Sequence, residues 1–140
     1  MLGKLLLALL VLTVAVQAYS NGYNRVLELV NQERGQAGVG PLSLDRSLIS
    51  DAEQHSRYQA ELGSITHNDK RGQGMDRLEL LGVQIQFWAE NVCYTSGGPD
   101  GAFDSWIRSP NHRENILNPQ ATHMGVGEAN GYWTQVFARY

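Results

Sequence analysis

Hydrophobic residues in the second half of the chain follow the spacing of a helix that is interrupted by a proline. Four of them recur at intervals of three and four residues, which places them on one helical face. They are Ala102, Phe103, Trp106 and Ile107. Pro110 ends this helix, because proline has no N–H to donate and disfavours helical geometry in the residue before it. We expect a second short helix, capped by Asn111, with His112 just past the turn and Asn118 at its end.

Two longer helices are predicted in the first half of the chain. Their possible N-terminal caps are Ser20 or Asn21 for the first helix and Ser43 or Asp45 for the second. The first helix ends among the glycines at 35–40, and the second ends at Gly63. His55 falls on the apolar stripe of the second helix, at the four-and-three spacing of its buried positions. We therefore assign His55 a structural role first.

Extended segments fill most of the remaining chain. The stretch 64–67 is strand-like and precedes a polar loop, and 83–94 reads as extended after a short helix at 76–81. Alternating residues on both sides of Asn130 and Gly131 predict a β-hairpin, because Asn-Gly favours the tight turn that joins two strands. Three or four helices, with strands gathered mostly in the second half, imply an α+β sandwich with an antiparallel sheet.

The N-terminal stretch has the pattern of a secretory signal peptide. Lys4 precedes an unbroken apolar run from Leu5 to Val16, and Ala18 suits a cleavage site. The run is shorter than the roughly 20 apolar residues that a membrane-spanning helix needs. We predict a signal peptide at 1–18, a single domain at 19–140, and secretion of the mature protein with no transmembrane segment.

Charge and cysteine content narrow the possible partners. The full chain has a formal net charge of −3, and loss of the signal peptide with Lys4 would make it one unit more negative. Basic residues are scattered among acidic ones, so neither a nucleic-acid groove nor a polybasic membrane patch is indicated. Cys93 is the only cysteine, so no internal disulfide can form. We expect its thiol to be buried between Val92 and Tyr94.

Seven motifs along the chain together resemble the CAP superfamily, which includes cysteine-rich secretory proteins, insect venom antigens and plant pathogenesis-related proteins and whose domain is also called SCP. They are GVGPLSLD, the HS pair in the second helix, the isolated His67, AENV, WIRSPNHRENILNP, THMGVG and GYWTQVF. They occur in the expected order over nearly the whole mature chain. The resemblance implies an α-β-α sandwich with a central, mostly antiparallel sheet, of the short bacterial-like type without disulfides.

The resemblance also implies a cleft lined by two histidines and two glutamates, which in some members holds a divalent metal. His67 matches the first histidine and Glu90, in AENV, the first glutamate. Ser109 stands where animal and plant members have the second glutamate, and Tyr132 stands where they have a histidine. His112 matches the histidine of the bacterial-type SPxHR pattern and could supply the missing imidazole. The implied metal ligands are therefore His67, Glu90 and His112, with Zn²⁺ as the ion.

Three functions fit these residues. The first is a secreted binding module, not an enzyme, whose cleft takes a metal ion and which binds a sterol or fatty acid elsewhere between its helices, as the family resemblance implies. The second is a protease-like hydrolase that uses the cleft, with Ser109, His112 and Glu114, or Ser56 beside His55, as its nucleophile and base. The third is a structural or interaction domain in which the histidines and Glu90 form a satisfied hydrogen-bonded network.

Overall fold

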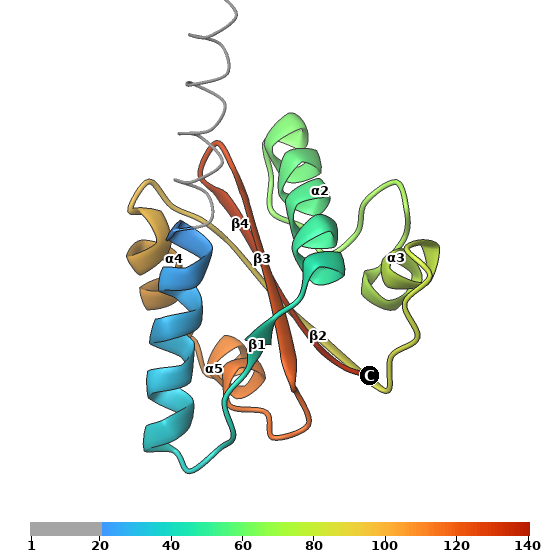
Figure 1. Ribbon diagram of the computed structural model, residues 1–140. Coiled ribbons are helices and arrows are strands. Elements are labelled where there is room, and N and C mark those ends of the chain that lie inside the picture. Colours follow the sequence, from blue (N-terminus) through green and yellow to red (C-terminus); the bar gives the residue numbers. More distant parts are fainter. Residues whose placement is uncertain (1–20) are drawn as a thin grey trace, which may run out of the picture.

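A four-stranded sheet lies between two layers of helices in the computed structural model, which describes residues 21–140 (Figure 1). One layer contains α2 (Arg46–Leu62) and α3 (Gly74–Leu80). The other contains the helix at 21–36, α4 (Gly98–Ile107) and α5 (Pro110–Ile116). This three-layer arrangement confirms the α-β-α sandwich. The predicted signal peptide lies outside the described residues.

The sheet is antiparallel except at one edge. Its order is β1 (Ser43–Leu44), β3 (His123–Ala129), β4 (Tyr132–Arg139) and β2 (Phe87–Tyr94). Only the two-residue β1 is parallel to its neighbour, β3. The predicted hairpin joins β3 to β4 through Asn130 and Gly131, whose φ values of 49° and 84° are those of the expected tight turn. Strand β2 forms the other edge of the sheet.

The helix α2 approaches the sheet closely because β3 carries glycines beneath it. A Cβ atom at Gly125 would come within 2.2 Å of the Leu48 backbone, and one at Gly127 within 2.3 Å of the Ala52 backbone. Of the two predicted caps, Ser43 and Asp45, the structure shows Asp45, which accepts hydrogen bonds from two backbone N–H groups. The helix ends at Gly63, which adopts the left-handed conformation with φ of 71°. The predicted bounds of this helix are confirmed.

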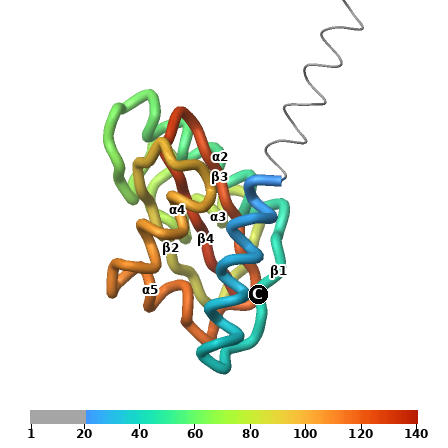
Figure 2. Tube along the Cα trace, turned by 90° about the vertical axis from the view of Figure 1, so that its left-hand side faces the viewer, coloured from blue at the N-terminus to red at the C-terminus, as the bar shows by residue number. Residues whose placement is uncertain are grey.

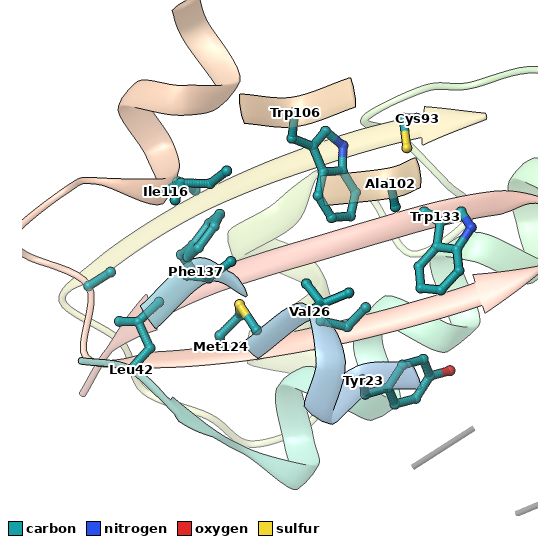
Figure 3. Packing of buried hydrophobic residues seen from close by; sticks show 14 residues of the cluster. Tyr23, Val26, Leu42, Cys93, Ala102, Trp106, Ile116, Met124, Trp133 and Phe137 are labelled. Carbon is teal, nitrogen blue, oxygen red and sulfur yellow. The ribbon is translucent and has the colours of Figure 1, made fainter. Parts of the chain in front are cut away.

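The main hydrophobic core fills the space between the sheet and the layer of α4 and α5. Trp106 extends from α4 toward the sheet and is fully buried near Phe137 and Ile116 (Figure 3). Cys93 belongs to the same cluster, and burial raises the pKa of its thiol to about 12. Its predicted burial is confirmed, and the raised pKa keeps the thiol protonated and unreactive at neutral pH.

The break between α4 and α5 falls near its predicted place, but Asn111 is not the cap of α5. Ser109 occupies the N-cap position and Pro110 the first turn, where a missing N–H costs nothing. Figure 2 views the molecule from this layer, with α4, α5 and the helix at 21–36 in front of the strands. Buried Arg34 ties this helix to the segment after α5, because its guanidinium donates to the carbonyl oxygens of Ile116, Asn118 and Ala121.

The predicted strand at 64–67 is wrong, because this segment bonds to side chains of α2 in place of a neighbouring strand. The Thr66 N–H donates to Gln59 Oε1 at 3.0 Å, and the Thr66 carbonyl oxygen lies 2.6 Å from His55 Nε2. The predicted extended segment 83–94 is a strand only from Phe87 onward. Within residues 21–140, no helix combines the length and the apolar character needed to cross a bilayer.

Candidate functional site

His67 and Glu90 lie together at the edge of the sheet. Glu90 is buried on β2, directly opposite Val136 of β4, so its side chain points to the layer of α2 and α3. His67 lies in the loop between these two helices, and its Nδ1 is 3.0 Å from Glu90 Oε1. The carboxylate leaves the proton on Nδ1 and the lone pair of neutral His67 on Nε2. The side chain of His67 is 56% exposed, so this lone pair is available to a ligand.

The bond to Glu90 also sets the protonation of His67. It raises the pKa of His67 above its ordinary value, although partial burial of the imidazole acts in the opposite direction. A folded-state pKa above the unfolded one means that protonated His67 stabilises the fold fully below about pH 6.5. This contribution disappears as the pH rises through the raised pKa.

Arg77 of α3 occupies the centre of a buried ionic network behind this pair. Its Nε lies 3.1 Å from Asp51 Oδ1, and a terminal nitrogen contacts Glu90 Oε2. All three side chains are fully buried. Burial opposes the charge of Arg77, but the carboxylates of Glu90 and Asp51 outweigh it and raise the pKa of Arg77. Arg77 therefore remains a cation that neutralises part of the charge on both carboxylates.

The network continues from Arg77 to the outer side of α2. His55 Nδ1 lies 2.9 Å from Arg77 and 2.8 Å from Asp69 Oδ2, which confirms the structural role assigned to His55. Asp69 also accepts hydrogen bonds from Arg71. Burial alone would raise the pKa of Asp69, but the bonds from Arg71 and His55 lower it to about 2. The network thus joins the carboxylates of Asp51, Asp69 and Glu90 to the guanidiniums of Arg71 and Arg77, with His55 between Asp69 and the Thr66 carbonyl oxygen.

Hydrogen bonds from two asparagines join the helix turn that carries His112 to strand β2. Asn91 Nδ2 donates to the His112 carbonyl oxygen at 3.1 Å, and Asn115 Nδ2 donates to the Glu90 carbonyl oxygen at 3.3 Å. Helix α5 thus covers the edge of β2 at Glu90. His112 Nδ1 is buried and has no hydrogen-bond partner. Burial, and then the charge of nearby His67, lower the pKa of His112, which is therefore neutral at pH 7.

The two residues that depart from the family pattern take no part in these contacts. Tyr132 pairs with Tyr94, four positions along the strand from the Val136–Glu90 pair, or roughly 13 Å away. Ser109 precedes α5, and its side chain forms no capping bond. The structure therefore places His112, and not Tyr132, next to His67.

The alternative nucleophiles differ in their surroundings. The Ser56 hydroxyl donates within the core to the Gly127 carbonyl oxygen at 3.0 Å and lies 2.8 Å from Thr134 Oγ1, so it anchors α2 to the sheet. Glu114 is exposed on α5. Neither Ser56 nor Ser109 forms a hydrogen bond with a histidine in the described part of the chain.

As a candidate cation site, these residues offer two imidazoles and one carboxylate in different states. His67 is half-exposed, so its Nε2 can reach a ligand, whereas His112 Nδ1 is buried without a partner and both oxygens of Glu90 already bond to His67 and Arg77. Among residues 21–140, no three His, Cys, Asp or Glu side chains converge closely enough to hold a metal ion. Glu90 is therefore better placed to orient a metal-binding histidine through a hydrogen bond than to bind a metal ion itself.

Sequence reasoning identified His67, Glu90 and His112 but missed the charged residues behind them. Arg77 and Asp51 lie in helices, where charged side chains usually face solvent. Only the three-dimensional structure shows that both are buried. In α3 the apolar residues do not mark one buried face, because Leu80 lies two residues from Leu78 and so on the opposite side of the helix. Leu80 is exposed, whereas Leu78 and its neighbour Arg77 are buried.

Comparisons with known proteins agree on a family. The family model CAP, described as the cysteine-rich secretory protein family, matches residues 27–137. YkwD of Bacillus subtilis is 33% identical over 126 residues, which are 88% of this chain and 48% of that protein. The B. subtilis membrane protein YlbC is 34% identical over 116 residues, which are 82% of this chain and 34% of that protein. This chain thus spans about half the length, or less, of the curated relatives it matches.

Solved structures show the same fold. An extracellular SCP-domain protein from Bacillus anthracis superposes with a TM-score of 0.82 and 28% identity, over 86% of this chain and 41% of that one. An outer surface protein of Borrelia burgdorferi has a TM-score of 0.73 and 17% identity, over 81% of this chain and 88% of that one. At this identity the second likeness concerns the fold alone.

Proposed function

Because the chain belongs to the cysteine-rich secretory protein (CAP) family, we propose that it is an extracellular binding module whose cleft at His67, Glu90 and His112 takes up a divalent cation, Zn²⁺ first. His67 and His112 would be the ligands, and Glu90 would orient His67 from behind. The apolar N-terminal segment and the extracellular B. anthracis protein support the proposed location.

One observation carries the proposal. His112 Nδ1 is buried without a partner, and His112 is close enough to His67 for the charge of His67 to lower its pKa. The Nδ1 of His67 is in turn anchored by the Glu90 carboxylate. Carboxylate-backed histidine is the usual arrangement of a metal-ligating imidazole. Zn²⁺ held by two imidazoles keeps positions for water or for a donor from a bound partner, so its role would be to recognise that partner.

Zinc binding should depend steeply on pH. We expect the protein to bind Zn²⁺ at about pH 7.5 and to lose it by about pH 5.5, because a ligating histidine must be deprotonated. The raised pKa of His67 should move the onset of this loss above the ordinary histidine value of about 6.5. Titration calorimetry across this pH range measures the effect. The protein without metal should remain folded, since its core is complete.

Variants of His67, His112 and Glu90 test the proposed roles of two metal ligands and of the carboxylate that orients one of them. His67→Ala and His112→Ala should each abolish measurable binding, and Glu90→Gln should weaken it by about 10- to 100-fold. His123→Ala is the matched control, because His123 lies on β3 next to Tyr140 and outside the cleft. Circular dichroism verifies that each variant is folded. If Glu90→Gln does not fold, His67→Ala still tests the site, because His67 is half-exposed and its removal should not unfold the protein. Absence of binding in the parent would leave the hydrogen-bonded network as the better account of the cleft.

A second candidate ligand is apolar. A groove of about 460 Å³ lies beside α3, within the usual size range of small-molecule pockets, and is lined in part by Met75, Val83, Ile85 and Tyr140. Met75 and Tyr140 are exposed although both are large and apolar. These features favour a fatty acid or sterol as occupant.

Direct binding decides this second candidate. We expect radiolabelled palmitate or cholesterol to bind the parent, and Met75→Asp to weaken the binding by about tenfold or more. Leu62→Asp is the control, because Leu62 is similarly exposed at the end of α2 and does not line the groove. No retention of either lipid by the parent would refute an apolar ligand. The hydrolase remains the alternative for the cleft, and loss of peptide cleavage in Ser109→Ala would support it.

A further inference from the structure

A second, polar pocket lies on the outer side of α2, away from the apolar groove. It has a volume of about 240 Å³ and is formed by one stripe of α2 and by the loop that precedes α3. Its lining residues are Gln54, Arg57, Tyr58, Glu61, Asp69, Lys70 and Arg71. At about 30 Å³ for each water molecule, this volume corresponds to roughly eight waters, which is about the size of a monosaccharide.

Positive charge dominates this pocket although the chain as a whole is acidic. Arg57 and Lys70 form no ion pair with any residue in the described part of the chain, even though Glu53 and Glu61 lie one helical turn from Arg57. Glu53 instead accepts a hydrogen bond from the Tyr23 hydroxyl. Two cations without partners at one pocket can take an oxyanion, and a guanidinium can do so with two parallel hydrogen bonds.

Arg71 adds a donor that is already fixed in place. Its guanidinium bonds to Asp51 and to both carboxylate oxygens of Asp69, so it loses little freedom when a ligand binds. The side chain of Asp69 is only 3% exposed, whereas that of Arg71 is 21% exposed. A ligand in the pocket therefore meets the guanidinium and not the carboxylate that neutralises it.

The other lining groups suit a ligand that carries hydroxyls. Tyr58 packs against His55 with ring centroids 6.5 Å apart, so its own ring is held at the pocket wall. An aromatic ring provides a flat apolar surface, and Glu61 and Gln54 can accept hydrogen bonds from hydroxyl groups. From this combination we propose that the pocket binds a saccharide unit that bears an oxyanion, either phosphate or carboxylate. This site is independent of the metal-binding proposal.

Nuclear magnetic resonance titration of the ¹⁵N-labelled protein, with EDTA to remove metal, tests the site. Glucose 6-phosphate or glucuronic acid should shift the backbone amides of 54–61 and 69–71, and the stronger of the two probes identifies the oxyanion. Glucose should bind at least about tenfold more weakly, because it lacks the charge. If glucose binds as well as the anionic sugars, the pocket does not recognise an oxyanion. If inorganic phosphate binds as well as glucose 6-phosphate, the pocket does not recognise the saccharide.

Charge-removing variants complete the test. Arg57→Gln and Lys70→Gln should each weaken binding of the stronger probe by about tenfold. Both side chains are exposed and without ion pairs in the described part of the chain, so the fold should be unaffected. Arg46→Gln is the matched control, because it removes the same charge from an exposed position of α2 outside the pocket. The site is refuted if neither anionic sugar shifts these amides, or if Arg46→Gln weakens binding as much as Arg57→Gln.

Discussion

Replacement of Arg77 by methionine is expected to lower the free energy of unfolding by about 3 to 5 kcal/mol, because it leaves Asp51 and Glu90 buried without their shared cation. The pair would then face an apolar side chain of similar length, which cannot replace the lost hydrogen bonds. Urea denaturation followed by circular dichroism at about pH 7.5 measures the loss. A total stability of about 5 to 15 kcal/mol makes this a large fraction of the whole.

The deficit of Arg77→Met should shrink as the pH falls. Burial already raises the pKa of Asp51 in the parent, where Arg77 and Arg71 act in the opposite direction. Without Arg77 the folded-state pKa of this carboxyl must rise further. A carboxyl whose pKa is higher in the folded state destabilises the fold at high pH and less so once it is protonated. We therefore expect a smaller difference between parent and variant at about pH 5 than at about pH 7.5.

Arg71→Met is the matched control for this experiment. Arg71 contacts Asp51 and Asp69 but is partly exposed, and Arg77 would still neutralise Asp51. Asp69 also keeps its bonds to His55 and to the backbone N–H of residue 71, so the loss should be smaller than that of Arg77→Met. An Arg77→Met variant within about 1 kcal/mol of the parent would show that the network contributes little to stability.

The elements that local rules could predict are those whose causes lie close together in the sequence. Asp45 caps α2, Gly63 ends it, and Asn130 with Gly131 forms the hairpin turn, all as expected. Each depends on backbone conformations that a few residue types favour. The resemblance to the CAP family is likewise confirmed, since the family model matches residues 27–137.

The features that escaped prediction depend on contacts between distant segments. The stretch 64–67 looked like a strand, but Gln59 and His55 provide its hydrogen-bond partners, so it needs no neighbouring strand. Gly125 and Gly127 alternate along β3 because the backbone of α2 crosses directly above them. Alternating glycines in a strand can indicate such a close approach, but the sequence does not say which element approaches.

The candidate site shows the same division. Glu90 could face either solvent or a polar cavity on sequence grounds, and the β2–β4 register places it inside, opposite Val136. Its partner Arg77 lies on a helix of seven residues, which is too short for hydrophobic periodicity to reveal the buried face. Tertiary structure positions every partner of a buried ionic network, so a local sequence pattern cannot predict it.

Trp106→Ala should destabilise the protein by about 3 to 5 kcal/mol, through the lost burial of the indole and the cavity that it leaves. The side chain is fully buried between α4 and the sheet, in the cluster that contains Phe137 and Ile116 (Figure 3). Its Nε1 is a buried donor without a hydrogen-bond partner, which itself costs about 1 to 3 kcal/mol. Trp106→Phe removes that donor and keeps most of the ring, so we expect it to lose far less stability than Trp106→Ala. Thermal and urea unfolding of both variants separate the two effects. If Trp106→Ala is as stable as the parent, the apolar face of α4 does not hold the core together, and the spacing of residues 102–107 was misinterpreted.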